Sequence, residues 1–600
     1  MRRFLILNYF IFQLCILNTG MAQEDRTLYT LAMPEPYTHN FDVSVTVSPV
    51  SGEYTDFKIP AWAPGSYLVR DFAKNISDVS AFTPDGDTLK LYKTDKQTWR
   101  VLNGKTKSIT IKYKVYAFTM SVRTSYLDDQ EGYVNGTSVF MYTDQAAGRP
   151  VRLDINPYPG WEKISTGLAQ DTSNPNRFYA DNYDQLVDCP IEIGNQVTFD
   201  FTSHGILHEV AMAGPGNYDI SRLKSDMMKI TSACIDMFGI NENKKYVFIV
   251  HNVEQGDGGL EHTNSVSLSV NRWIYEPRGS YIGFLGLVTH EYIHQWIVKR
   301  IRPSSLVHYN YESENYTDLL WMMEGFPSYY DDVMLSRLGY ISDTDYINRF
   351  TGAINSVENM PGNEVSSVAE ASFNAWIKQY QPDENFINSS VSYYTKGNVL
   401  GALLDLQVIH ATMGKQDLHD VIRYLYDEYY RKNFTGINET IIKKAFEKFI
   451  GHSMDDFFNR YVDGTASIDY KKYLGFAGLI VVNLNNGEGP PFAGIGMRDR
   501  DGKTIVQTVY ANSAAQKAGI APEDEIIGLD GFRVNTSRFQ DYIKSKNPGD
   551  TVNVLLSREG ILYNKNIILE KDNRKQYSIF VNPGATPLQK TVYNKWLLGK

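Results

Sequence analysis

The residues best placed to do chemistry lie in one short stretch, LVTHEYIHQWIVKRIRP, which runs from Leu287 to Pro303. His290, Glu291 and His294 form the pattern H-E-x-x-H within it. Apolar neighbours suit a buried helix, and residues four apart on a helix share one face, so both imidazoles would point the same way. Such a pair can bind Zn²⁺ at about 2.0–2.1 Å per nitrogen, with the glutamate within reach of a water molecule. The alternative is a core helix whose two histidines only make internal hydrogen bonds.

A catalytic zinc takes three protein ligands, so the stretch needs a partner elsewhere in the chain. Glu324 in LLWMMEGFPSYYDD is the candidate, with 29 residues between it and His294. Its neighbours are apolar enough for a core helix, where a glutamate is costly unless it is paired or bound to a metal. The alternative is a carboxylate on the polar face of a helix, a position that Asp331 in the same segment could also occupy.

The composition is that of an ordinary globular chain, with 42% hydrophobic and 21% charged residues among 600. This length predicts about three to five domains. A net charge of -10 without a long basic run argues against nucleic acid as a partner.

Residues 1–22 have the features of a signal peptide. Arg2 and Arg3 precede an apolar stretch, and Gly20-Met21-Ala22 is similar to the small-residue cleavage site at the end of a signal peptide. We therefore expect an exported protein, periplasmic or secreted. No later stretch reaches about 18 apolar residues, so we expect no transmembrane segment in the mature chain. Cys189 and Cys234 could pair or remain free.

Two large regions follow the signal peptide. Residues 23–203 alternate in hydrophobicity, as in FDVSVTVSPV and SITIKYKV, which predicts a sandwich-like β domain. Residues 204–475 mix one buried strand (246–250), an alternating run that starts at Ser265, and several helical segments. The helices are expected at 218–237, 399–410, 417–430, 439–450 and 454–461.

A small β domain is expected over residues 476–573. Its glycine loop at Gly494, Ile495 and Gly496 can present backbone N–H groups to a peptide carboxylate, although ordinary turn chemistry would also explain the glycines. In the tail, residues 574–600, Leu588, Val592 and Trp596 share a helical face. We expect this tail to dock onto another domain.

With these residues assembled, the chain resembles the glycyl aminopeptidases of peptidase family M61 over most of its mature length. The stretches THEYIHQWIVKRIRP and LWMMEGFPSYY are similar to that family's metal-binding helices. PAWAPGSYLVRDFAKNI (60–76) and SVRTSYLDD (121–129) are similar to its amino-terminal β domain, and the carboxy-terminal segment resembles a PDZ domain. The resemblance implies a thermolysin-like catalytic domain, a zinc ion, and release of small amino-terminal residues.

When the family's functional residues are matched to positions of this sequence, the resemblance implies that His290, His294 and Glu324 bind zinc. It also implies that Glu291 is the general base. Tyr394 resembles the tyrosine that related enzymes direct at the oxyanion; its alternative is a structural tyrosine, with Tyr393 adjacent.

The segment Gly259-Leu260-Glu261-His262, which follows Gly258, is similar to the glycine-x-methionine-glutamate-asparagine motif of related zinc aminopeptidases. It departs at Leu260 and His262. Its glycines would let the backbone approach a substrate, and Glu261 would bind the substrate's amino terminus. The alternating run after it would lie along the cleft. The alternative for Glu261 is a turn-capping residue on a surface loop.

The sequence thus predicts a multidomain α+β protein: an N-terminal β-sandwich-like domain, a thermolysin-like zinc peptidase domain with a helical C-terminal part, and a PDZ-like β domain. The predicted function is zinc-dependent removal of N-terminal glycine or alanine from peptides. The PDZ-like domain would bind a peptide or a C-terminal tail. Two alternatives remain open, a zinc endopeptidase and a non-catalytic peptide-binding protein on a peptidase scaffold.

Overall fold

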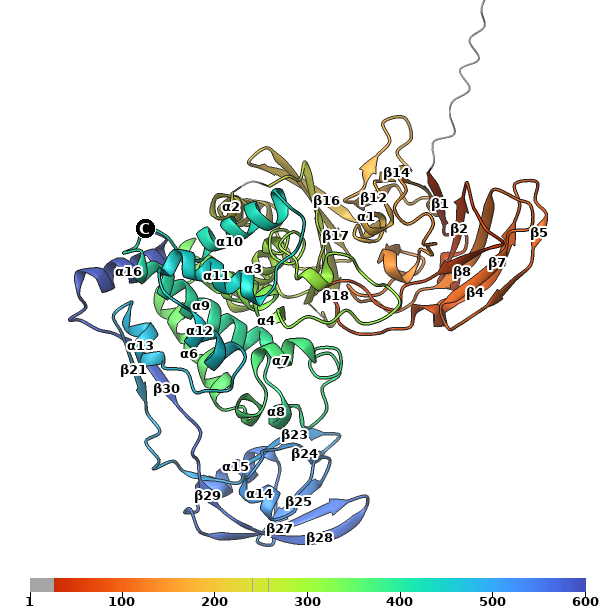
Figure 1. Ribbon diagram of the computed structural model, residues 1–600. Coiled ribbons are helices and arrows are strands. Elements are labelled where there is room, and N and C mark those ends of the chain that lie inside the picture. Colours follow the sequence, from red (N-terminus) through yellow and green to blue (C-terminus); the bar gives the residue numbers. More distant parts are fainter. Residues whose placement is uncertain (1–25, 240, 257) are drawn as a thin grey trace, which may run out of the picture.

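The computed structural model describes residues 26–239, 241–256 and 258–600. An N-terminal β domain, a central domain rich in helices and a small C-terminal β domain follow one another along the chain (Figure 1). This confirms the predicted multidomain α+β architecture. The predicted signal peptide, residues 1–22, lies outside the described residues.

The N-terminal domain is built from three sheets around one hydrophobic core. In β2 (Asn40–Val47) every second residue is buried, which is the pattern that predicted a half-exposed strand. The largest sheet has eight strands: β13 (Ala169–Gln170), β14 (Arg177–Ala180), β11 (Val151–Asn156), β1 (Thr27–Ala32), β2, β8 (Ile109–Tyr116), β4 (Ile76–Phe82) and β5 (Thr88–Leu89). The smaller sheets are β3 (Tyr54–Lys58), β7 (Thr98–Leu102) and β6 (Leu91–Lys93), and β12 (Lys163–Thr166), β15 (Ile191–Gly194), β10 (Glu131–Val134) and β9 (Tyr126–Leu127).

The central domain contains a five-stranded sheet whose edge strand carries the Gly-Gly-Leu-Glu segment. The order is β16 (Val197–Ser203), β17 (Ile206–Ala213), β18 (Lys245–Val253), β20 (Ser265–Asn271) and β19 (Gly258–Glu261). β19 pairs antiparallel with β20. The expectation that the run from Ser265 lines the cleft is therefore wrong. That run is β20, buried between β18 and β19, and the edge that an extended peptide could join belongs to β19 itself.

Helices pack against this sheet and carry the H-E-x-x-H pattern. α2 (Ile220–Phe238) and α11 (Glu439–Ile450) match their expected bounds closely. α3 (Arg278–Ile293) ends just before His294, which keeps a right-handed helical conformation as the C-cap residue. α9 (Tyr393–Ala411) begins six residues earlier than expected, because Ser392 caps its N-terminus by accepting from Thr395 N.

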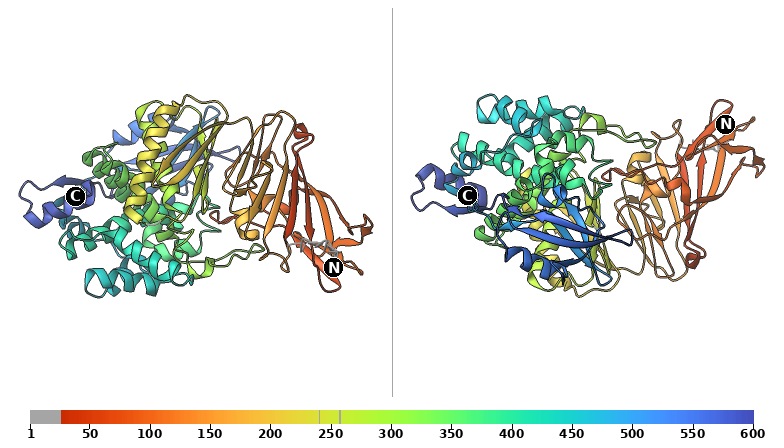
Figure 2. Two further views of the ribbon diagram at one scale, coloured as in Figure 1. Left: turned by 90° about the horizontal axis from the view of Figure 1, so that it is seen from above. Right: turned by 90° about the horizontal axis from the view of Figure 1, so that it is seen from below.

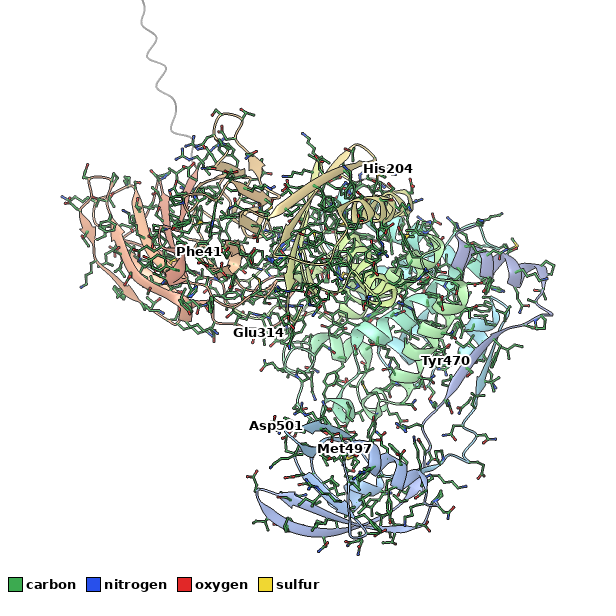
Figure 3. The ribbon with its side chains drawn as sticks, turned by 180° about the vertical axis from the view of Figure 1, so that it is seen from behind. Phe41, His204, Glu314, Tyr470, Met497 and Asp501 are labelled. Carbon is green, nitrogen blue, oxygen red and sulfur yellow. The ribbon has the colours of Figure 1, made fainter. Side chains whose placement is uncertain are left out.

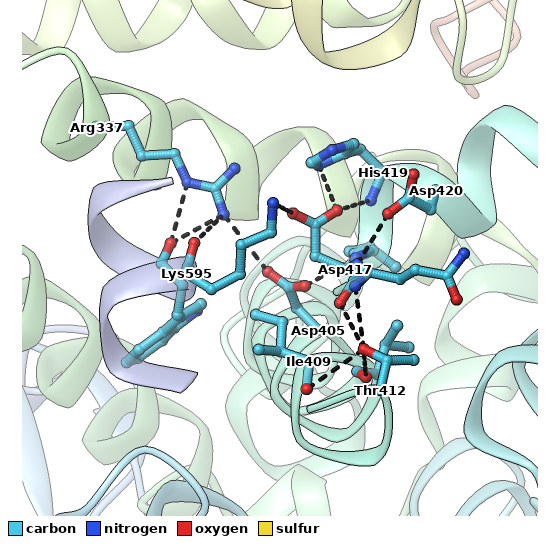
Figure 4. A network of polar contacts seen from close by, with 12 residues as sticks. Arg337, Asp405, Ile409, Thr412, Asp417, His419, Asp420 and Lys595 are labelled. Carbon is cyan, nitrogen blue, oxygen red and sulfur yellow. Dashed lines mark hydrogen bonds and ion pairs between the residues drawn. The ribbon is translucent and has the colours of Figure 1, made fainter. Parts of the chain in front are cut away.

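The C-terminal tail returns to the central domain, as expected from its apolar face. α16 (Pro587–Leu598) packs on α9 and α5 (Gly325–Arg337). Trp596 is fully buried, and its Nε1 donates to the Tyr329 hydroxyl at 3.1 Å. Lys595 forms an ion pair with Asp417 at 3.4 Å, and Arg337 Nε donates to the carbonyl of Trp596 at 3.0 Å (Figure 4).

The C-terminal β domain has a separate core and a narrow connection. Its core residues all fall between Ala493 and Leu569. The chain enters through β21 (Leu479–Asn483) and leaves through β30 (Tyr577–Val581), and these two strands pair antiparallel. In the view from behind, Met497 and Asp501 mark this domain, well away from Phe41 in the N-terminal domain (Figure 3).

The main sheet of this C-terminal domain runs in the order β23 (Ile495–Arg500), β24 (Lys503–Val509), β25 (Glu525–Leu529), β27 (Thr551–Arg558) and β28 (Ile561–Ile568). β26 (Phe532–Arg533) pairs beside β25, and β22 (Pro491–Phe492) pairs with β29 (Glu570–Lys571). The helices α14 (Ala514–Lys517) and α15 (Thr536–Lys544) complete it. From above and from below, α16 and the C-terminus lie at the end of the molecule opposite the N-terminal domain (Figure 2).

Cys189 and Cys234 are both buried free thiols, which decides the question that the sequence left open. Among the described residues, no helix combines the length and the apolar character needed to cross a membrane.

Candidate active site

Three side chains converge at the end of α3. His290 Nε2 lies 3.6 Å and His294 Nε2 3.4 Å from the same oxygen, Oε2 of Glu324. Glu324 sits at the junction of α4 (Leu320–Met323) and α5, and is only 3% exposed. Tetrahedral zinc ligands at about 2.1 Å from the ion lie about 3.4 Å from one another, so this donor set fits the metal. The structure therefore brings together the three ligands predicted from sequence.

Partners on the far side of each imidazole orient the pair. His290 Nδ1 lies 3.6 Å from Asp331 Oδ2, and His294 Nδ1 lies 3.2 Å from the carbonyl of Ile297. Such contacts fix the ring and direct Nε2 toward the metal position. From the sequence, Asp331 was interpreted only as a possible carboxylate on the polar face of a helix. Its spacing could have identified it, because Asp331 follows Glu324 by seven residues, which is two turns of a helix.

Glu291 lies beside the metal position without a protein partner for one of its oxygens. It is 5% exposed, and its Oε2 is buried without a hydrogen bond to any described residue. Burial raises its pKa to about 7. A buried carboxylate oxygen left without a donor suits a group that must bind and release a proton.

The strand β19 runs directly over Glu291. A Cβ atom added to Gly259 would lie 2.2 Å from Glu291 Oε1, so only glycine allows this approach. Gly258, at the start of the strand, has a positive φ of 99° and open space where a side chain would be. The two glycines thus place the backbone of an edge strand next to the proposed base.

Glu261 ends the same strand and points toward the same centre. It is 4% exposed, and its carboxylate, that of Glu291 and a ring nitrogen of His294 all lie within 4.8 Å of one another. This position is incompatible with a turn-capping residue on a surface loop. Glu261 is a second buried carboxylate at the metal position.

A loop of the N-terminal domain packs against Glu261. Gly65 has a φ of 88°, and a Cβ atom there would lie 2.6 Å from Glu261 Oε1. Trp62 and Tyr67 from the same loop belong to the hydrophobic core of the central domain. Arg123, also from the N-terminal domain, donates to the carbonyl of Gly259 at 3.4 Å. These contributions were not identified from sequence, although both loops fall in the segments that carry the family resemblance.

Two tyrosines with different exposure lie at the start of α9. Tyr393 is fully buried, whereas Tyr394 is half-buried and its hydroxyl lies 3.3 Å from that of Tyr380. Tyr380 in turn donates to the carbonyl of Gly65 at 3.2 Å. Burial and then the charge of Glu324 raise the pKa of Tyr394 well above its usual value, so its hydroxyl stays protonated near the metal position. Tyr380 was missed because no sequence motif surrounds it.

The predicted carboxylate-binding loop lies in the C-terminal β domain. Gly494 has a φ of 80°, and its carbonyl accepts from Tyr510 N at 3.0 Å. Ile495 and Gly496 begin β23, the edge strand of the main sheet of this domain. The loop therefore leads into an edge strand that a peptide could extend.

Comparison with known proteins agrees with this geometry. The model of the peptidase M61 N-terminal domain matches residues 28–195, the M61 glycyl aminopeptidase model matches residues 283–400, and a PDZ domain model matches residues 491–569. An aminopeptidase N family protein from Idiomarina loihiensis has a crystal structure with 30% identity and a TM-score of 0.88. The match covers 95% of this chain and all of that one.

More distant similarities were also found. An 88-residue segment is 31% identical to a protein of Borreliella burgdorferi with the provisional name of zinc metalloprotease. This chain spans about a fifth of that relative's length, since the match covers 19% of it and 15% of this chain. An M1 zinc metallopeptidase from Deinococcus radiodurans is 12% identical with a TM-score of 0.47, over 74% of this chain and 95% of that one.

The fold and the His-His-Glu site together define a zinc metallopeptidase. More particularly, the chain belongs to peptidase family M61, the family of the glycyl aminopeptidases, and ends in a PDZ domain.

Proposed function

We propose that this protein is a zinc-dependent aminopeptidase that removes small amino-terminal residues, glycine or alanine, from peptides. The observation that carries the proposal is the position of Glu261. A second carboxylate, at the end of an edge strand and within 4.8 Å of the Glu291 and His294 donor atoms, is suited to bind an ammonium group. An endopeptidase has no use for such a group.

His290, His294 and Glu324 would hold the zinc ion. When bound, it would polarise the scissile carbonyl and lower the pKa of water toward about 7. Glu291 accepts the proton of the attacking water and passes it to the leaving amine. The Tyr394 hydroxyl donates to the developing oxyanion.

Glu261 determines the register of the substrate. A peptide that extends β19 has its amino terminus beside the Glu261 carboxylate and its first peptide bond beside Glu291. The close contact between Gly65 and Glu261 leaves little space around that amino terminus, which supports a preference for small first residues. We also propose export, on the basis of residues 1–22, and binding of a peptide carboxyl terminus by the PDZ domain.

The test compares a glycyl reporter amide with the same reporter blocked at its amine. We expect about one zinc per chain and turnover of the free-amine substrate only. Glu291→Gln should keep zinc and lose about 10²- to 10⁴-fold in kcat, and Glu324→Ala should lose zinc. Glu261→Ala should lose about ten- to a hundred-fold on the free amine alone.

Equal loss on free and blocked substrates in Glu261→Ala would make the endopeptidase the better conclusion. Absence of zinc and of turnover in the purified protein would favour a peptide-binding function instead.

A further inference from the structure

A buried polar cluster joins the N-terminal domain to the residues that follow Glu261. Asp188, which caps the C-terminal end of α1 (Tyr183–Val187), accepts from the backbone N of Thr263 at 2.9 Å. Its carboxylate also lies 3.4 Å from His262 Nδ1 and 2.7 Å from Lys299 Nζ. One carboxylate of the N-terminal domain thus contacts three residues of the central domain.

Lys299 depends on this carboxylate. Its side chain is 2% exposed, and a buried ammonium group without a counter-ion is strongly destabilising. Asp188 is equally dependent on its partners: burial alone would raise its pKa, but Lys299 and His262 hold that pKa well below its usual range. The pair is therefore charged and tightly coupled.

Glu261 is a second carboxylate in the neighbourhood of Lys299, because His262, the residue that follows it, and Lys299 both contact Asp188. Burial lowers the pKa of Lys299, and the charges of Asp188, Tyr309 and Glu261 together raise it above its usual value. Within the described part of the chain, the Glu261 carboxylate has no hydrogen bond and no ion pair of its own. The turn that carries Lys299 is fixed, because Lys299 N donates to the carbonyl of His294 at 3.2 Å.

The side chain of Lys299 and the amino terminus of a peptide are chemically alike. Both are ammonium groups, and both are attracted to a buried carboxylate. If Lys299 turned to Glu261, it would occupy the position that the substrate needs. We propose that Asp188 is a positioning residue, which holds the Lys299 ammonium so that Glu261 stays available for the amino group of the substrate.

This inference rests on the proposed role of Glu261, and its test begins with Asp188→Asn. The asparagine oxygen can still accept from Thr263 N, but the charge that holds Lys299 is lost. We expect KM for a glycyl reporter amide to rise about ten- to a hundred-fold, with kcat within about threefold. The glycolyl amide, in which a hydroxyl replaces the amine, should show no such rise.

A double variant separates positioning from mere support of the fold. In Asp188→Asn/Lys299→Met the competing ammonium is absent, so KM for the glycyl amide should return to within about threefold of the wild type. A double variant as poor as, or poorer than, Asp188→Asn would overturn the proposal. The matched control is Asp184→Ala on the same helix, which loses the 2.8 Å bond from the Tyr311 hydroxyl and should leave KM unchanged.

A cavity beside the cluster allows a second measurement if Asp188→Asn folds poorly. Its volume is about 270 Å³, and Asp188, His262 and Thr263 are among the lining residues. Formate added to Asp188→Ala should enter this space, replace the lost carboxylate and lower KM for the glycyl amide in a concentration-dependent way. A KM that does not respond to formate would likewise refute the role of Asp188.

Glu261→Ala distinguishes the two possible failures. If Glu261→Ala does not lose activity selectively on free-amine substrates, the proposed function itself fails. If Glu261→Ala behaves as expected and Asp188→Asn does not, only the positioning role is wrong.

Discussion

The N-terminal β domain and the PDZ domain are joined to the same central domain in opposite ways. Trp62 and Tyr67 of the N-terminal domain are part of the central hydrophobic core, and Gly65 lies so close to the Glu261 carboxylate that an added Cβ would be 2.6 Å from it. The PDZ domain keeps its own core and is attached through the paired strands β21 and β30. A domain that shares a core with the active site must fold together with it, whereas one with a separate core can fold and move independently.

The side chain of Asn388 also contacts the PDZ domain. Asn388 of α8 (Phe386–Ser389) donates to the carbonyl of Val509 at 2.8 Å and accepts from Ala511 N at 2.8 Å. The N-terminal domain, in contrast, contributes side chains, backbone and a buried ion pair to the cleft. We therefore expect changes at these two boundaries to have very different effects on catalysis.

The largest effect is expected in the tail, which follows the PDZ domain in sequence but packs in the central core. Trp596→Ala should reduce the free energy of unfolding of the central domain by about 3–5 kcal/mol, because a fully buried aromatic side chain is lost. Differential scanning calorimetry would show a lower Tm for this domain and an unchanged PDZ transition. A fall in the PDZ transition alone would contradict the assignment of the tail.

The next largest effect is expected at Gly65, and Gly494 in the PDZ domain is the matched control. Gly65→Ala should lower kcat/KM for a glycyl amide by about a hundred-fold while zinc is retained, because the positive φ is strained for alanine and Cβ would displace Glu261. Gly494 has a similar φ, and a Cβ added there would lie only 2.1 Å from Ser513 Cβ. Gly494→Ala should nevertheless leave turnover unchanged. Equal losses in both variants would show that the two domains are coupled to the site to the same extent.

Excision of the PDZ domain should have a small effect. Replacing residues 487–573 with a short glycine-serine linker keeps the paired strands β21 and β30 and the helix α16. The two ends to be joined are close, because Asn485 Nδ2 donates to the carbonyl of Arg574 at 2.8 Å. We expect zinc content to be unchanged and glycyl amide turnover to stay within about threefold, since the lost contacts are worth about 1–2 kcal/mol. Loss of zinc from the folded variant would show that the PDZ domain supports the metal site.

The smallest effect is expected for Asn388→Ala. It removes two hydrogen bonds at the boundary, so the PDZ domain should become more mobile while turnover changes less than about twofold. Small-angle scattering would detect a broader distribution of domain positions, and Glu384→Ala, an exposed residue just before α8, is the control. A large change in kcat would instead show that α8 transmits the state of the PDZ domain to the cleft.

Much of the site could be predicted because its signals are local. The spacing of His290 and His294 depends on one helix, and the apolar setting of Glu324 on its immediate neighbours. The bounds of α11 were predicted without error for the same reason, since periodicity and the cap at Asn438 lie within the segment. The start of α9 was misplaced by six residues because Tyr393 to Asn398 show no clear helical pattern.

What the sequence alone determined about this protein is the set of groups that could do chemistry: two histidines and a glutamate that can hold zinc, a glutamate between the histidines that is placed to act as a base, and a glycine-rich segment that ends in Glu261. Only the tertiary structure decided that β19 is the edge strand, that Gly65 and Asp188 reach the cleft from another domain, and that Asp331 orients His290. The physical reason is that periodicity and spacing report the local surroundings of a residue. Contacts between Asp188, Thr263 and Lys299 depend instead on how distant segments pack together.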